Sequence, residues 1–162
     1  MALQARDGSY GVKSSMFWVP QPGSNESGMT GYTYPAEDAE GWVWDRARAD
    51  SLGRAYNFPH QVSVYVAMYH ALRDNDKLHA SQPAEWYLDQ AARTTLGMWN
   101  VSRWYSQMGL MVGSVFRELL RDLIDEEHPL APAVRGIMFN RTAVGVTYFS
   151  SNACKPGPYD RH

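Results

Sequence analysis

The sequence has a single cysteine, almost no net charge and no long hydrophobic run. Because Cys154 is alone, an intrachain disulfide and a cysteine-ligated zinc site are both excluded. The formal net charge of -2 gives no electrostatic basis for binding nucleic acid or an anionic membrane surface. No apolar run approaches the roughly 18 residues of a membrane span. Met1 to Asp7 is polar with no apolar segment after it, so no signal peptide is visible.

Motifs for metals, cofactors and nucleophilic catalysis are also scarce. His60, His79 and His128 are too scattered to suggest a metal site, and no HExxH spacing occurs. The glycines match neither a phosphate-binding loop nor a dinucleotide fingerprint. We therefore expect no metal and no cofactor. The sequons at Asn25, Asn100 and Asn140 matter only if the chain is secreted, and the sequence leaves its location open.

What is present favours one globular domain made mostly of helices. The 162 residues are 44% hydrophobic and only 20% charged, which is enough apolar material for a substantial core. Apolar spacing predicts helices over about 59–73, 83–99 and 111–126. The first is apolar nearly all round, which is typical of a buried helix, and the other two are amphipathic, with Asp122 on the wet face of the third. No helix is predicted in the irregular segment 1–55.

The pattern changes after the third predicted helix. Pro129 and Pro132 interrupt helical periodicity, and a weak alternation predicts a strand within 137–149. The end of the chain, from Cys154 on, is predicted to be disordered. We therefore expect residues 128–162 to be a divergent, partly disordered tail.

Four short runs of sequence resemble an uncharacterised family that is itself similar to the six-hairpin glycosidases. They are Phe17–Pro20, Gly41–Asp45, Tyr56–Gln61 and Met111–Phe116. The resemblance covers about residues 17–127 and implies antiparallel helical hairpins that form part of an (α/α)6 toroid. Three helices are a fraction of such a ring, so residues 1–127 are expected to be a partial domain.

The segment 28–61 interleaves aromatic, acidic and glycine residues with no regular period. In the toroids that the chain resembles, the substrate cleft lies where the inner helices begin, which here implies segments 37–61 and 100–110. The acid or base candidates are Glu37, Asp38 and Glu40, for which a solvated acidic turn is the alternative. Asp45 is more simply a helix cap or an ion-pair partner. The candidate sugar-binding residues are Trp42, Trp44, Tyr56, His60 and Trp104.

Each of these binding candidates has a simpler structural interpretation. Trp42 and Trp44 are two residues apart, so an extended chain turns both rings to one side, either toward a sugar or toward the core. For His60, a neutral imidazole bonded to the backbone is the alternative. The predicted function is a glycoside-hydrolase-like protein, complete or incomplete, that acts on or binds a carbohydrate. The alternatives are a non-catalytic carbohydrate-binding module and a truncated helical fragment that self-associates through uncovered helix faces.

Overall fold

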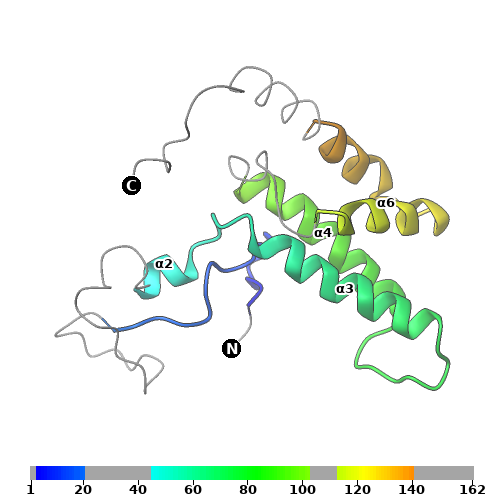
Figure 1. Cartoon of the computed structure of the whole chain (residues 1–162), viewed down its shortest axis with the longest axis horizontal. Coiled ribbons are helices and arrows are strands. Elements are labelled where there is room, and N and C mark those ends of the chain that lie inside the picture. Colours follow the sequence, from blue (N-terminus) through cyan, green and yellow to red (C-terminus); the bar gives the residue numbers. More distant parts are fainter. Residues whose placement is uncertain (1–2, 21–44, 103–112, 141–162) are drawn as a thin grey trace.

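The computed structural model of the chain describes residues 3–20, 45–102 and 113–140 (Figure 1). Its helices are α2 (Arg46–Asp50), α3 (Asn57–Arg73), α4 (Ala84–Val101) and α6 (Val115–Asp125), followed by a helical segment over 131–140. Within these ranges the only extended pairing is an isolated antiparallel bridge between Gln4 and Val12. The prediction of a mostly α protein is confirmed. No helix in the described ranges is both long and apolar enough to cross a membrane.

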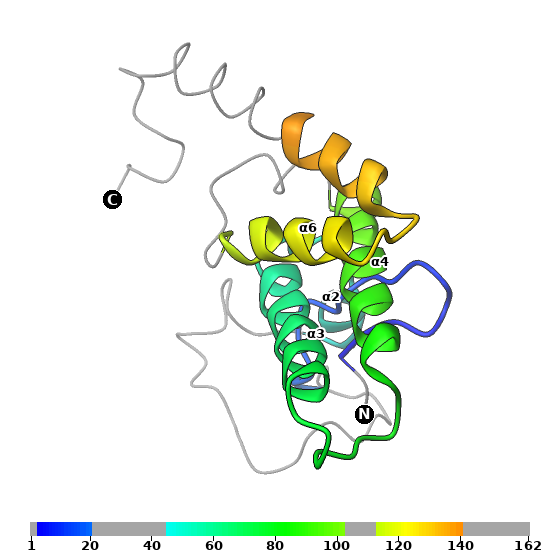
Figure 2. The same ribbon diagram turned by 90° about the vertical axis from the view of Figure 1, so that its right-hand side faces the viewer.

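Helices α3 and α4 form an antiparallel hairpin, and α6 lies across both of them (Figures 1 and 2). The connection 74–83 joins the two long helices at one end of the hairpin, between the two helices that were predicted over 59–73 and 83–99. The third helix differs from the expectation, because it crosses the hairpin at a steep angle instead of running antiparallel beside it. The cores of the three helices nevertheless merge into one apolar cluster.

A short helix, α2, occupies part of the segment that was predicted to be irregular. Asp45 is its N-cap, and the Asp45 carboxylate accepts a hydrogen bond of 2.7 Å from the backbone N–H of Arg48. The capping prediction for Asp45 is therefore confirmed, whereas the absence of helix over 1–55 was wrong at Arg46–Asp50. Five residues are too few to show a helical period, so only the capping residue could signal this helix.

The strand prediction within 137–149 was wrong for residues 137–140, which are helical. Pro132 is the second residue of the helical segment 131–140, where its missing N–H has no intrahelical partner to lose. Val134 is fully buried and joins the segment to the core. A proline that resembles a helix breaker thus lies at a helix start.

The most deeply buried helix is α4, and not α3 as its apolar composition predicted. On α3, Val64 is 56% exposed, and Ala67 and Ala71 are exposed as well. The reason is that the backbone of the N-terminal segment packs directly against α4 at Gly97, in addition to the contacts that α3 and α6 make with α4. The buried residues of α4 are Tyr87, Leu88, Ala91, Ala92, Thr94, Thr95, Gly97 and Met98.

The N-terminal segment 3–15 is hydrogen-bonded to both long helices, through the side chain of Gln4 and through the backbone carbonyls of Lys13 and Ser14. The Gln4 amide nitrogen donates to Thr94 Oγ1 at 2.7 Å, and Tyr65 Oη donates to the Gln4 side-chain oxygen. The Asn57 amide nitrogen donates to the carbonyls of Lys13 and Ser14, both at 2.8 Å. These bonds satisfy polar groups that would otherwise be buried unpaired as the segment covers α4.

Gly97 allows the segment to approach α4 closely. A Cβ at this position would lie 2.6 Å from the carbonyl oxygen of Ser9 and 3.0 Å from that of Tyr10. Real Cβ atoms do not come so close to backbone oxygens, so a side chain here requires the segment to move. The glycine is a packing requirement in a helix interior, where glycine is otherwise unfavourable.

We expect Gly97→Ala to lower the free energy of unfolding by about 1–3 kcal/mol, because the methyl group collides with the backbone at Ser9. The matched control is Gly136→Ala in the exposed helical segment 131–140, where a Cβ has no atom within 4 Å. That change should add up to about 1 kcal/mol through helix propensity alone. Urea denaturation of the three proteins measures both effects. A Gly97→Ala variant as stable as the wild type would contradict the packing role of Gly97.

Candidate functional site at the α2 end of the hairpin

Most of the predicted site residues lie outside the described residues. These are the carboxylates Glu37, Asp38 and Glu40 and the tryptophans Trp42, Trp44 and Trp104. Two predicted binding residues, Tyr56 and His60, are described, together with the chain before and after 21–44 and 103–112. The described part of the candidate site consists of the elements that lie next to those two stretches in sequence.

One hydrogen bond joins the two segments that were predicted to share the cleft end. Ser102 Oγ, directly after α4, donates at 2.6 Å to the carbonyl oxygen of Gly53, just ahead of α3. Helix α3 begins and α4 ends at the same end of the hairpin (Figure 1), which is the end at which Gly53 and Ser102 are bonded. Segments 45–60 and 100–102 thus meet at this end.

Tyr56 and His60 occupy different environments at the start of α3. Tyr56 precedes the helix, is half-buried and packs against the hydrophobic core. His60, in the first turn, is exposed to solvent, while its backbone carbonyl accepts a hydrogen bond of 2.8 Å from Ser63 Oγ. Tyr56 therefore contributes to the packing of the core at this end of the hairpin, and the His60 imidazole is accessible to a ligand.

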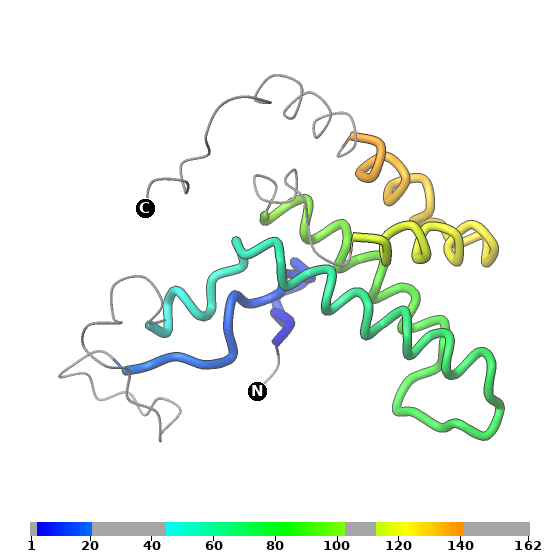
Figure 3. The backbone as a smooth tube through the Cα atoms, in the orientation of Figure 1, coloured from blue at the N-terminus to red at the C-terminus, as the bar shows by residue number. Residues whose placement is uncertain are grey.

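The segment Met16–Pro20 runs back along α2, as the tube of Figure 3 shows. Its anchor is a pair of backbone hydrogen bonds, from Ser14 N to the Ser51 carbonyl at 2.8 Å and from Ser15 N to the Ala49 carbonyl at 3.1 Å. The Arg46 guanidinium carbon lies 5.6 Å from the centroid of the Trp18 ring, within the range of a cation–π contact. Trp18 belongs to the runs that carry the family resemblance, but its partner Arg46 on α2 could not be predicted from them.

The charges at this end are arranged around α2. Lys13 forms an ion pair with Asp50, and the Arg46 Nε lies 3.7 Å from the other carboxylate oxygen of Asp50. The hydrogen bond from Lys13 holds the pKa of the Asp50 carboxyl below its ordinary value. Asp50 is therefore a stable anion that positions cations, and not a proton donor near neutral pH. Over the described ranges, no cluster of three or more His, Cys, Asp or Glu could hold a metal ion.

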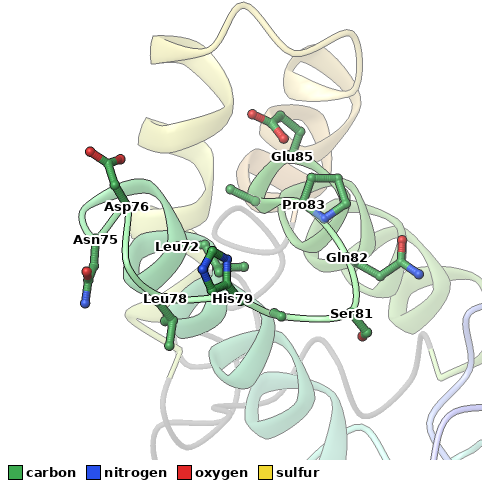
Figure 4. Close-up of a pocket in the computed structure, with 11 residues that line it drawn as sticks. Leu72, Asn75, Asp76, Leu78, His79, Ser81, Gln82, Pro83 and Glu85 are labelled. Atoms are coloured by element: carbon green, nitrogen blue, oxygen red, sulfur yellow. The ribbon is translucent and has the colours of Figure 1, made fainter.

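A shallow depression of about 530 Å³ lies at the opposite end of the hairpin, along the connection between α3 and α4 (Figure 4). Apart from Leu72 and Ala84, every residue that lines it is exposed. Asp76 and Glu85 lie on opposite sides of it and do not converge (Figure 4). Because an active site shifts pKa values and strengthens polar contacts by excluding water, this open surface is a poor candidate.

A polar cluster between α3 and α6 is the part of the structure that the sequence did not reveal. Asp122 was expected on the wet face of its helix, and this was wrong: its side chain is only 3% exposed. His70 Nε2 lies 2.7 Å from Asp122 Oδ2, and Arg73 Nη1 lies 3.8 Å from Oδ1. Tyr69 Oη donates to Glu126 Oε1 at 2.6 Å. These contacts attach the C-terminal end of α6 to α3, so His70 has a structural role.

The fold and this end of the molecule define a small α-helical domain built on one antiparallel hairpin, with an aromatic and charged end. The chain belongs to a family of unknown function (DUF5695), which matches residues 1–145. The match includes the helical segment 131–140. Neither a curated protein nor a solved structure matches the chain.

We expect Asp122→Ala to lower the free energy of unfolding by about 1–3 kcal/mol, because it removes the buried acceptor of His70. Asp125→Ala, three residues further on the exposed side of the same helix, is the control and should change stability by less than about 0.5 kcal/mol. Urea denaturation distinguishes the two. Equal stability of both variants would show that the cluster does not hold α6.

Burial raises the pKa of Tyr65 and of Tyr69, and the hydrogen bond to Glu126 raises that of Tyr69 further. In the unfolded chain both phenols ionise at lower pH, so their contribution to stability is fully present below about pH 10 and is lost as the pH rises above it. In a pH titration of the folded protein followed by tyrosinate absorbance at 295 nm, Tyr69→Phe should reduce the absorbance change in the highest pH range. The chain unfolded in guanidinium is the reference, and a loss in the early part of the curve would contradict the burial argument.

Proposed function

We propose that the chain is a glycoside-hydrolase-like helical domain whose carbohydrate site lies at the α2 end of the hairpin. The observation that supports this proposal is the Ser102–Gly53 hydrogen bond, which brings the segments before α3 and after α4 together. Both segments continue into stretches rich in aromatic residues, and the first also carries three carboxylates. Aromatic faces and paired acids are the groups that sugar hydrolysis uses.

In this proposal the acidic group Glu37, Asp38 and Glu40 provides the acid and base of the reaction. One carboxyl protonates the leaving oxygen, and a second attacks the anomeric carbon or activates a water. Carboxyls about 5 Å apart retain the anomeric configuration, and a wider separation inverts it. Trp42, Trp44 and Trp104 stack on sugar rings, and Tyr56 and His60 border the site from the start of α3.

We expect one of Glu37→Gln, Asp38→Asn and Glu40→Gln to lower the rate of glycan hydrolysis by roughly 100-fold or more while binding persists, because the amide keeps the shape and loses the proton. Asp76→Asn, at the far end of the hairpin, is the matched control. The measurement is reducing-end release from a panel of soluble polysaccharides, combined with affinity electrophoresis on the same polysaccharides.

Three outcomes of this experiment are informative. Binding by every variant, with no hydrolysis by the wild type, would favour a carbohydrate-binding module without catalysis. Equal hydrolysis by all four variants would remove the acidic group from the mechanism. A folded wild-type monomer that neither binds nor cleaves any member of the panel would overturn the proposed function.

A second candidate, a helical piece that associates with other helices, is favoured by the exposed apolar residues of α3. Helix α3 carries no Asp, Glu, Lys or Arg between Asn57 and Leu72, yet Val64 is 56% exposed. Faces of this kind usually mark contact surfaces. Gel filtration with light scattering tests it: an oligomer without glycan activity supports this candidate, and a monomer that binds glycan argues against it.

A further inference from the structure

Five consecutive apolar residues, Met16–Pro20, lie next to α2, and none of them is buried. Phe17 is 60% exposed, and Met16 is 37% exposed. Single exposed apolar residues are ordinary on protein surfaces, but a contiguous run of them indicates a contact surface. The run also belongs to the motifs of the family resemblance, and no role has yet been assigned to it.

The backbone of this run is held in place, so the exposure of Phe17 is not that of a loose segment. Ser15 Oγ donates to the Phe17 carbonyl at 2.8 Å and accepts from the Phe17 N–H at 2.9 Å. Just before it, the backbone of Ser14 and Ser15 is paired with the end of α2, and Asn57 donates to the Ser14 carbonyl. An aromatic ring on an anchored backbone loses little freedom when a ligand binds.

The polar groups beside the run suit a ligand that is partly apolar and rich in hydroxyl groups. Arg46 lies over the Trp18 ring, and its side chain is 59% exposed, so its guanidinium N–H groups reach solvent at the edge of the aromatic surface. The Lys13–Asp50 pair adds an anion and a second cation to the same end. A purely apolar partner would bury these charges at a cost, whereas a sugar offers C–H groups to the rings and hydroxyls to the charges.

The position of the run agrees with this chemistry. Pro20 ends the run and Asp45 caps α2, so the described residues on either side of 21–44 are close in sequence to Trp18 and Arg46, which are in contact. We propose that the exposed Phe17 ring stacks on one sugar ring of a neutral glycan, while the contact between Trp18 and Arg46 helps to hold the Phe17 backbone in place. This inference rests on the proposed function and adds a binding subsite to it.

The test compares Phe17→Ala with Phe139→Ala by affinity electrophoresis in gels that contain soluble β-glucan, xylan, mannan or α-glucan. Phe139 is the matched control, because it is 74% exposed and lies on the helical segment 131–140, away from α2 (Figure 1). We expect Phe17→Ala to weaken the affinity for the glycan that retards the wild type by roughly 3- to 10-fold, which corresponds to the loss of one stacking contact. Phe139→Ala should bind as the wild type does, and Phe17→Tyr, which keeps the ring, should restore binding.

Failure of the subsite and failure of the proposed function give different results. If the wild type is retarded by a glycan and Phe17→Ala is retarded equally, the subsite is overturned and the carbohydrate function stands. If both alanine variants lose binding equally, the effect is general and the subsite is likewise overturned. If no polysaccharide retards the wild type, the proposed function and the subsite fall together. If Phe17→Ala instead converts an oligomer to a monomer in gel filtration without affecting glycan retention, the run is a protein contact.

Discussion

The close contact between the N-terminal segment and α4 is the constraint on which the rest of the fold depends. Because Gly97 has no side chain, the two backbones can come close together. The Gln4 side chain adds hydrogen bonds with Thr94 of α4 and Tyr65 of α3. The same segment then continues to Asn57 and α2, so its position also decides where Phe17 and Trp18 lie. The absence of a side chain at Gly97 in α4 thereby affects where Phe17 and Trp18 lie, at the other end of the N-terminal segment.

The uneven cover of the two long helices follows from this contact. The backbone of the N-terminal segment lies directly on α4 at Gly97, whereas one side of α3 retains exposed Val64, Ala67 and Ala71. Burial in this domain is therefore decided by which helix the irregular segments cover, and apolar content alone does not decide it. The polar cluster at Asp122 performs the complementary task, because it fixes α6 on α3 through charged and hydroxyl groups instead of apolar contact.

Helix class and position could be predicted from the sequence where the apolar period is long. The two hairpin helices were predicted within two residues at each end, and Asp45 was correctly predicted as a cap. Burial of Asp122 could not be predicted, since its partner His70 lies 52 residues away on another helix. The burial of α4 could not be predicted either, because the hydrogen bond between Gln4 and Thr94 joins residues that are 90 apart in sequence. Of the candidate site, only Tyr56 and His60 fall on described residues, and the carboxylates remain predictions from composition.

The contact between Gln4 and Thr94 also has a consequence for the order in which the protein forms during synthesis. Residue 4 leaves the ribosome long before residue 94, so the N-terminal segment is made first but can dock only after the hairpin exists. Until then Val12 and its neighbours are exposed, and long-range closure of this kind slows folding. The N-terminal segment is therefore translated before the hairpin but reaches its place after it, and its apolar residues stay exposed to solvent while the hairpin is being translated.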